Sequence, residues 1–337
     1  MRRHATELDP HADGRARQTQ PRWSRETGPS YAHNATYGSR MSAAEFRGVY
    51  VPIITPFADD GTVATEALER LAGRLIDDGA AGLVALGTAG EGPLLDDGER
   101  QAVLEVCARV CSDRGAQLIV GAGSNSTSHT MAAVRALDGT IGLTAVLCLV
   151  PYYLRPTQAG IRAHFEAVAD ASPVPVVIYN IPFRTGIRPI LETLLALAAL
   201  EGVAGLKHSV GALDEDTQQL LAAAPEDFAI LGGDDQHLAA LVLLGGSGGI
   251  TASAHLVTSR WVALADAALD GRVEEAREHQ SALLPVAEAG FAEPSPAVFK
   301  GVLHRRGEIP TPDVRLPFLP AVAESIDRAE VAAAACG

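Results

Sequence analysis

Residues 203–209, VAGLKHS, combine a short apolar run with an abrupt change to polar side chains. The run ends at Lys207, and its four residues contain no charge. A continuous apolar run of this length is typical of a strand that is buried on both faces of a parallel sheet. Seven further runs of this kind occur along the chain, at residues 49–54, 82–86, 117–120, 143–150, 175–178, 228–231 and 248–251.

Segments with helical periodicity separate these runs. Residues 65–78 place Leu68, Leu71 and Leu75 on one helical face, and residues 98–112 show a similar spacing of apolar side chains. Eight buried strands that each precede a helix predict a closed (β/α)8 barrel, the TIM barrel, because parallel strands need both faces covered. A doubly wound open sheet is the alternative.

The chain divides into three predicted parts. Residues 41–270 contain the barrel, and residues 271–337 form a C-terminal helical extension with helices at 273–288 and 296–305. Residues 1–40 lack apolar periodicity, so we expect a disordered N-terminal extension. A true start at Met41 and an organellar transit peptide are alternatives, the latter disfavoured by four acidic residues, Glu7, Asp9, Asp13 and Glu26.

Composition indicates a globular chain with a large core, since 47% of the residues are apolar and 20% are charged. The formal net charge of −14 disfavours nucleic-acid binding, because phosphate backbones are also negative. The sequence contains no apolar run that would span a membrane and no secretory signal, so we expect a cytoplasmic protein. Four cysteines and ten histidines without metal-binding spacing predict no metal site.

Lysine is rare in this chain. Of 27 lysine and arginine residues, only Lys207 and Lys300 are lysines. A guanidinium stays protonated, whereas a lysine amine can lose its proton and attack a carbonyl carbon. Lys207 follows a buried strand and is the predicted nucleophile. Lys300 lies in a helical segment and is expected to be structural, either as a salt-bridge partner or with its ammonium group snorkelling to the surface.

Other polar side chains that follow strands should meet the nucleophile, because active sites of such barrels lie at the carboxyl ends of the strands. Thr88, Tyr153 and Tyr179 supply hydroxyl groups there. A tyrosine linked to another hydroxyl can move the protons that imine formation requires, and turn amides at Thr88 and Ala89 can hold a carboxylate. The glycine-rich residues 245–249 could bind phosphate, but they precede the eighth strand, so a tight turn away from the site is favoured.

The strings at these strand ends resemble those of a family of class I pyruvate aldolases. This family includes dihydrodipicolinate synthase (4-hydroxy-tetrahydrodipicolinate synthase) and N-acetylneuraminate lyase, and the resemblance covers residues 48–328. The matching strings occur in the family's order: GTAGE at 87–91, PYYLRP at 151–156, YNIPFRTG at 179–186, GLK at 205–207, GGDD at 232–235, GGSGGIT at 245–251 and FAEPSPAVFK at 291–300.

The resemblance implies a catalytic role for four residues. Lys207 would form an imine with pyruvate, and Tyr179 would accept and donate protons beside it. Thr88 and Tyr153 would complete the proton relay. Tyr153 would do so by reaching into a neighbouring subunit of a homodimer or homotetramer.

The resemblance also implies how the two substrates bind. The backbone at Thr88 and Ala89 would hold the pyruvate carboxylate, with Ile250 lining the same pocket. Arg184 would bind the carboxylate of the aldehyde, L-aspartate 4-semialdehyde. The implied activity is condensation of these two substrates through a lysine Schiff base, in lysine and diaminopimelate biosynthesis. No cofactor is implied beyond the covalent imine with the substrate.

Two departures from the family's strings leave other functions open. Ala89 replaces a threonine, and His208 stands where the synthases usually have an acidic residue. The main alternative is a related Schiff-base pyruvate aldolase or dehydratase that acts on a sugar acid or keto acid. A catalytically silent ligand-binding paralogue is disfavoured by the intact set of one lysine and three hydroxyls.

The resemblance finally bears on feedback by free lysine. Asn125 and Tyr152 match the effector pocket of lysine-inhibited members, whereas His129 stands at the position of the pocket's glutamate. Asp97 and Arg100 stand at the positions of its two histidines. A missing carboxylate and an added positive charge weaken attraction for an ammonium group, so we expect weak inhibition or none.

Overall fold

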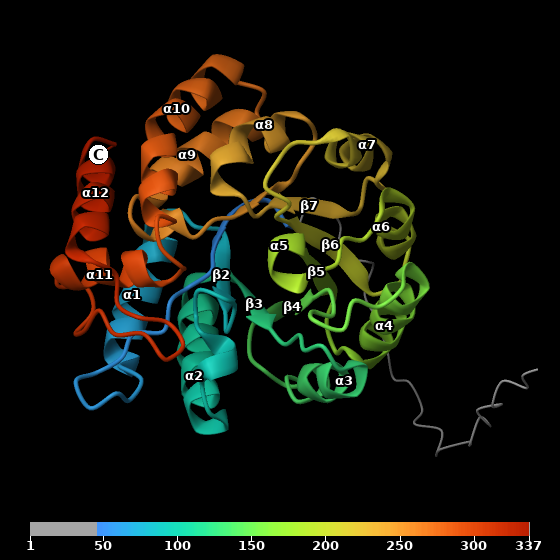
Figure 1. The fold of residues 1–337 in the computed structure, drawn as a ribbon, viewed down its shortest axis with the longest axis horizontal. Helices are drawn as coiled ribbons and strands as arrows, with labels where there is room; N and C mark the ends of the chain where they lie inside the picture. The colour runs from blue at the N-terminus through green and yellow to red at the C-terminus, as the bar shows by residue number, and fades with distance from the viewer. Residues whose placement is uncertain (1–45, 337) are drawn as a thin grey trace, which may run out of the picture. The chain divides into compact units, whose positions relative to one another are not determined.

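The eight predicted strands close into a barrel. The computed structural model describes residues 46–336, in which all neighbouring strands are parallel and β8 pairs with β1 (Figure 1). The prediction of a (β/α)8 barrel with additional C-terminal helices is confirmed, and the open-sheet alternative is wrong. The predicted N-terminal extension, residues 1–40, lies outside the described residues. The strands are β1 Gly48–Val51, β2 Gly82–Ala85, β3 Gln117–Gly121, β4 Leu143–Leu149, β5 Val176–Asn180, β6 Val203–His208, β7 Ala229–Gly232 and β8 Gly248–Ile250.

Helices follow every strand and surround the barrel (Figure 1). They are α1 Thr65–Asp77, α2 Asp97–Arg114, α3 Thr127–Arg135, α4 Gln158–Ala171, α5 Pro182–Thr185, α6 Leu191–Ala198, α7 Glu215–Ala223, α8 Leu238–Leu243 and α9 Thr258–Leu269, with 3₁₀ turns η1 Gly92–Leu94, η2 Asp235–His237 and η3 Ser253–His255. Three further helices follow, α10 Val273–Gly290, α11 Ala297–Arg305 and α12 Ala323–Ala334. Within residues 46–336, no helix is both long and apolar enough to cross a membrane.

The C-terminal helices pack on one side of the barrel. Helix α10 lies against α9, and α12 lies against both α10 and α11 (Figure 1). The glycine-rich residues 245–249 form the end of the turn between α8 and β8 and the first two residues of β8, away from the site as the sequence predicts. Strand β1 is shorter than predicted because Pro52 lacks the N–H group that would extend the ladder beyond Val51.

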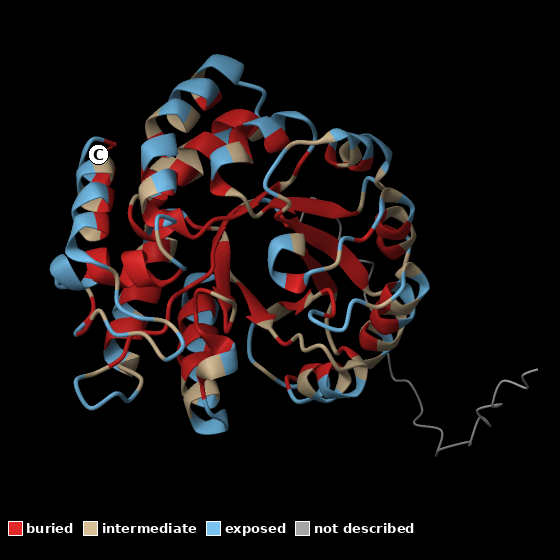
Figure 2. Ribbon diagram, in the orientation of Figure 1, coloured by how far each residue is buried: buried red, intermediate tan, exposed pale blue. Residues whose placement is uncertain are grey.

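The strands consist almost wholly of buried residues (Figure 2), because their side chains enter two apolar cores. The inner core fills the barrel with side chains such as Tyr50, Val84 and Ile119. The outer core lies between the strands and the helices and contains residues such as Leu83 and Ile178. Burial of alternate side chains in these two cores gives the continuous apolar runs of the sequence.

A bulge in β6 sets the direction of the Lys207 side chain. The register between β5 and β6 shifts once, and Ala204 is an extra residue without a partner. After this shift Lys207 pairs with Tyr179, and both side chains line the interior. Gly205 is required beside the bulge because a Cβ there would lie 2.7 Å from the carbonyl oxygen of Ala229. A one-residue change of register turns a side chain to the opposite face, so this bulge directs Lys207 inward while the first residue of β6 packs outward.

Candidate active site

A cavity of about 530 Å³ opens at the carboxyl ends of the barrel strands. The predicted site residues that line it are Lys207, Tyr179, Thr88, Ala89, Arg184 and Ile250. They follow or end strands β2, β5, β6 and β8, which are far apart in the sequence. Tyr153 is the one predicted site residue that does not line this cavity.

The Lys207 amine lies in a buried position beside an aromatic ring. The residue is 7% exposed, and its Nζ lies 4.4 Å from the centroid of the Tyr179 ring. Gly233 leaves room for this side chain, since a Cβ there would lie 2.8 Å from Lys207 Cε. Within residues 46–336, Lys207 forms no ion pair. An amine without a direct counter-charge at a cavity wall is placed to attack a carbonyl carbon.

No hydrogen bond joins the three predicted hydroxyl groups to one another within the described residues. Tyr179 is buried and Thr88 is half-buried, and in the described part of the chain no hydrogen bond links them. Tyr153 is 83% exposed and has a left-handed φ of 69°. A hydrogen bond from Tyr153 N to Thr185 O (3.1 Å) holds this conformation, which is unusual for a residue with a large side chain. The Tyr153 side chain is therefore outside the cavity of its own chain.

The turn after β2 offers two backbone N–H groups at the cavity wall. Among residues 46–336, neither the Thr88 nor the Ala89 N–H group has an acceptor. The turn is closed by hydrogen bonds from Glu91 N to Thr88 O (3.1 Å) and from Gly92 N to Gly87 O (3.3 Å). Consecutive free N–H groups in a turn bind anions. This turn can hold a small carboxylate close to Lys207.

Arg184 supplies a cation at the cavity mouth. It lies in α5, directly after β5, and its guanidinium carbon is 5.9 Å from the centroid of the exposed Phe183 ring. In the described part of the chain, no carboxylate pairs with Arg184. A free guanidinium can bind a carboxylate through two parallel hydrogen bonds.

Two groups of cavity residues were not assigned from the sequence. Asp234 and Asp235 follow β7, where the GGDD string gave a signal but no role. Phe291 and Glu293 lie between α10 and α11, in the predicted C-terminal helical extension. No periodicity or spacing in the sequence indicates that this connection returns to the strand ends.

Asp235 is a buried carboxyl group at the cavity. It is 1% exposed, and its Oδ2 accepts hydrogen bonds from Ser253 N (2.8 Å) and Ser253 Oγ. Its Oδ1 has no partner among the described residues. Burial raises the pKa of Asp235 to about 6, although the Ser253 hydrogen bonds and the Lys207 charge oppose this shift.

His208 lies on the outer face of β6 and does not line the cavity. Its Nε2 is 3.0 Å from Thr217 Oγ1, and its Nδ1 is 3.3 Å from Asn180 Nδ2. Thr217 donates its hydroxyl proton to Asp214, so His208 Nε2 carries the proton and Nδ1 accepts from Asn180. Burial lowers the pKa of His208 to about 4, which keeps the ring neutral at pH 7. His208 cannot select a substrate by direct contact.

Lys300 is buried and does not snorkel. It is 0% exposed, and its Nζ donates to Glu91 Oε1 at 2.6 Å. The expectation of a salt bridge is confirmed, and the alternative of a surface ammonium group is wrong. The two lysines of the chain therefore differ in environment, because only Lys300 has a carboxylate partner among residues 46–336.

A family model described as the dihydrodipicolinate synthetase family matches residues 45–335. The chain belongs to this family. The 4-hydroxy-tetrahydrodipicolinate synthase of Neisseria meningitidis serogroup B is 36% identical over 274 residues, which cover 81% of this chain and 93% of that protein. Membership confirms the predicted family and, with it, an enzyme of the class I aldolase type.

Two solved structures of the family resemble the chain closely. Dihydrodipicolinate synthase from Acinetobacter baumannii, complexed with pyruvate, has a TM-score of 0.82 and 30% identity, over 86% of this chain and 98% of that one. The enzyme from Cyanidioschyzon merolae, with lysine bound, has a TM-score of 0.82 and 32% identity, over 87% of this chain and 98% of that one.

The raised pKa of Asp235 predicts a pH-dependent contribution to stability. The protonated carboxyl group stabilises the fold fully below its unfolded pKa of 3.8, and this contribution is lost as the pH rises through about 6. Asparagine does not titrate, so the free energy of unfolding of Asp235→Asn should lack this loss. Relative to the unsubstituted protein, it should therefore increase by about 3 kcal/mol between pH 4 and pH 8. Urea denaturation of both proteins at several pH values measures this difference. A stability difference that is the same at every pH would contradict the prediction.

Proposed function

We propose that the chain is a 4-hydroxy-tetrahydrodipicolinate synthase, which condenses pyruvate with L-aspartate 4-semialdehyde through an imine on Lys207. The observation that carries this proposal is the buried Lys207 amine in a cavity whose turn amides and guanidinium have no partner among residues 46–336. Family membership and the relatives' names support it. The reaction belongs to lysine and diaminopimelate biosynthesis, and the proposal includes a cytoplasmic location.

Imine formation is the first step in this proposal. The neutral Lys207 amine attacks C2 of pyruvate, and the carbinolamine loses water to give the imine. The amides of Thr88 and Ala89 hold the pyruvate carboxylate, and Ile250 packs beside it. Tyr179, whose ring lies against Lys207 Nζ, delivers the proton that the departing water needs.

Carbon–carbon bond formation follows. Tyr179, which has given up its proton, accepts one from the imine's methyl group; this gives an enamine, whose terminal carbon attacks the aldehyde carbon. The aldehyde oxygen takes up a proton from the relay of Tyr179 and Thr88. The amino group of the condensed product then attacks the imine carbon, which closes the ring and releases Lys207. We propose that these steps need no metal or organic cofactor beyond the covalent imine.

Tyr153 completes the relay only if it serves another subunit. Its side chain is exposed, as are those of the adjoining Leu154 (62%) and of Phe183 (90%), which lies in α5, the helix whose Thr185 O accepts from Tyr153 N. Neighbouring exposed apolar side chains of this size favour contact with a protein partner. We propose a homodimer or homotetramer in which Tyr153 enters the neighbouring cavity. The strained backbone at Tyr153 is consistent with a constraint of this kind.

Trapping with sodium borohydride tests the nucleophile. Reduction in the presence of pyruvate should attach the adduct to Lys207 and leave Lys300 unmodified, because only Lys207 lines the cavity. Lys207→Arg should keep the melting temperature and lose about a thousandfold or more in kcat, since a guanidinium stays protonated. Intact mass and a peptide map identify the site. An active Lys207→Arg variant would contradict the Schiff-base proposal.

Arg184→Ala separates the two substrates. The loss of a charge-assisted hydrogen-bond pair should raise the KM for L-aspartate 4-semialdehyde about tenfold to a hundredfold. Trapping of pyruvate should be unchanged. Arg188→Ala is the matched control, because Arg188 pairs with Asp214 and Asp216 on the surface. Parallel loss of pyruvate trapping in Arg184→Ala would show that Arg184 has a structural role instead.

Free L-lysine should inhibit the enzyme weakly or not at all. Arg100, at the position of an effector-pocket histidine, is held by a hydrogen bond from Nη1 to Gly92 O (2.8 Å), and it repels an ammonium group. His129 offers no carboxylate to such a group. Steady-state rates at rising lysine concentration test this. Strong inhibition at sub-millimolar lysine would show that Asp97 replaces the missing carboxylate.

A further inference from the structure

The turn that carries the Thr88 and Ala89 amides is anchored from behind by a buried charge pair. Glu91 ends this turn with a left-handed φ of 55°, and it is 1% exposed. A residue with a side chain adopts this conformation only where its surroundings hold it. The contacts of the Glu91 side chain therefore bear on the shape of the turn.

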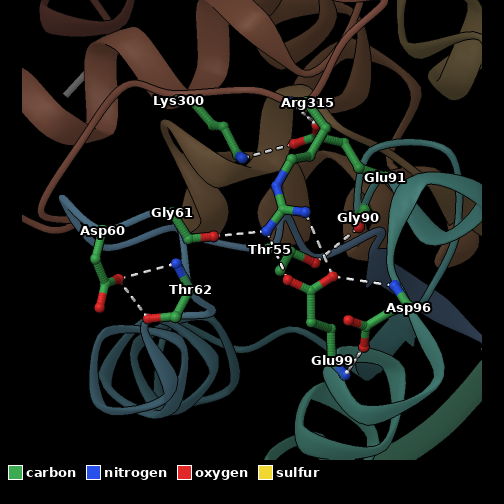
Figure 3. Close-up of polar contacts among 10 residues, drawn as sticks. All are labelled: Thr55, Asp60, Gly61, Thr62, Gly90, Glu91, Asp96, Glu99, Lys300 and Arg315. Carbon is green, nitrogen blue, oxygen red and sulfur yellow. Dashed lines mark hydrogen bonds and ion pairs between the residues drawn. The ribbon is translucent and has the colours of Figure 1, made fainter.

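Both carboxylate oxygens of Glu91 are bound by the C-terminal extension (Figure 3). Oε1 accepts from Lys300 Nζ at 2.6 Å, and Oε2 accepts from the backbone N of Arg315 at 2.7 Å. Lys300 Nζ also donates to Asp313 O at 2.7 Å and lies 3.9 Å from the centroid of the Phe57 ring. These contacts fix Lys300 from several directions.

A second layer of contacts fixes the segment that holds Glu91. The Arg315 guanidinium donates to Glu99 Oε1 at 2.6 Å and to Gly61 O at 2.6 Å (Figure 3). Glu99 belongs to the capping box that begins α2, in which the Asp96 side chain accepts from Glu99 N at 2.8 Å. The extension is thus tied to the loop after β1 and to the start of α2, the helix that follows the turn.

The front of the same turn faces the cavity. Glu91 N donates to Thr88 O, so a rotation at Glu91 moves the peptide that contains the Ala89 amide. Thr55 Oγ1 donates to Gly90 O at 2.7 Å, which holds the peptide between Gly90 and Glu91 from the side of β1 (Figure 3). The position of the two anion-binding amides depends on how firmly Glu91 is held.

We infer that Lys300 and Glu91 are positioning residues for the pyruvate carboxylate, acting through the backbone of residues 88–91. This inference rests on the proposed function. A stabilising role alone explains the pair poorly, because burying two charges is costly and apolar replacements are often neutral or better. Burial lowers the pKa of Lys300 to about 8 against the opposing charge of Glu91, in keeping with a large desolvation cost.

The experiment uses full-length Lys300→Met, Glu91→Gln and the double variant. The double variant removes both buried charges and should therefore melt near the unsubstituted protein, which keeps the test valid if either single variant folds poorly. Arg305→Met is the matched control, since Arg305 also lies in α11 but pairs with Asp327 and Glu330 on the surface.

Displacement of the Thr88 and Ala89 amides should weaken the binding of pyruvate and leave the binding of the aldehyde unchanged. In Lys300→Met and in the double variant, the KM for pyruvate should rise about tenfold to a hundredfold, with kcat and the aldehyde KM changed by less than about threefold. Hydrogen exchange of a peptide spanning residues 86–92 should be faster than in the control, while other peptides exchange as before.

Two results would overturn the inference. One is an unchanged pyruvate KM in the double variant, and the other is an equal loss for both substrates with faster exchange throughout the chain. Failure of the proposed function gives a different result. In that case the unsubstituted protein forms no pyruvate adduct with borohydride, and exchange in the variants still reports whether the pair anchors the turn.

Discussion

Pairing of β1 with β8 closes the sheet, and this closure determines where every functional side chain lies. Because all strands are parallel, their carboxyl ends meet at one rim, and the segments after β2, β5, β6 and β8 line one cavity. Inner side chains such as Tyr50 and Ile119 fill the barrel below this rim. The cavity is therefore confined to the layer that contains Lys207, and an open sheet would not bring these four segments together.

The two lysines have different roles because their surroundings differ. Each ammonium group lies over an aromatic ring, Lys207 at 4.4 Å from the centroid of Tyr179 and Lys300 at 3.9 Å from that of Phe57. Lys300 also has a carboxylate at 2.6 Å and is fully buried, whereas Lys207 has no such partner in the described part of the chain and lines the cavity. Of the two lysines, Lys207 is therefore the one whose amine a substrate carbonyl carbon can reach.

The strands could be predicted because burial on both faces leaves short apolar runs, and β-branched residues with flanking glycine or proline distinguish most of them from an apolar helix such as α8. Most site residues could then be predicted because the active site of such a barrel lies at the carboxyl ends of its strands. Three features could not be placed from the periodicity of the sequence. The ion pair of Glu91 joins residues 209 positions apart, the outward direction of Tyr153 results from a left-handed backbone, and Glu293 reaches the cavity from a connection between outer helices. Each depends on tertiary contacts that sequence periodicity does not encode.

The C-terminal extension takes part in the site from two sides. Phe291 and Glu293 form part of the cavity wall, and Lys300 and the Arg315 backbone hold Glu91 behind the anion-binding turn. A barrel that ended after α9 would leave the Glu91 carboxylate without either partner, and a buried charge without partners is strongly destabilising. The architecture changes near residue 270, from the barrel to the outer helices, but residues on both sides of this point contribute to the site. The turn that binds the anion has one face made by the barrel and the other made by the extension.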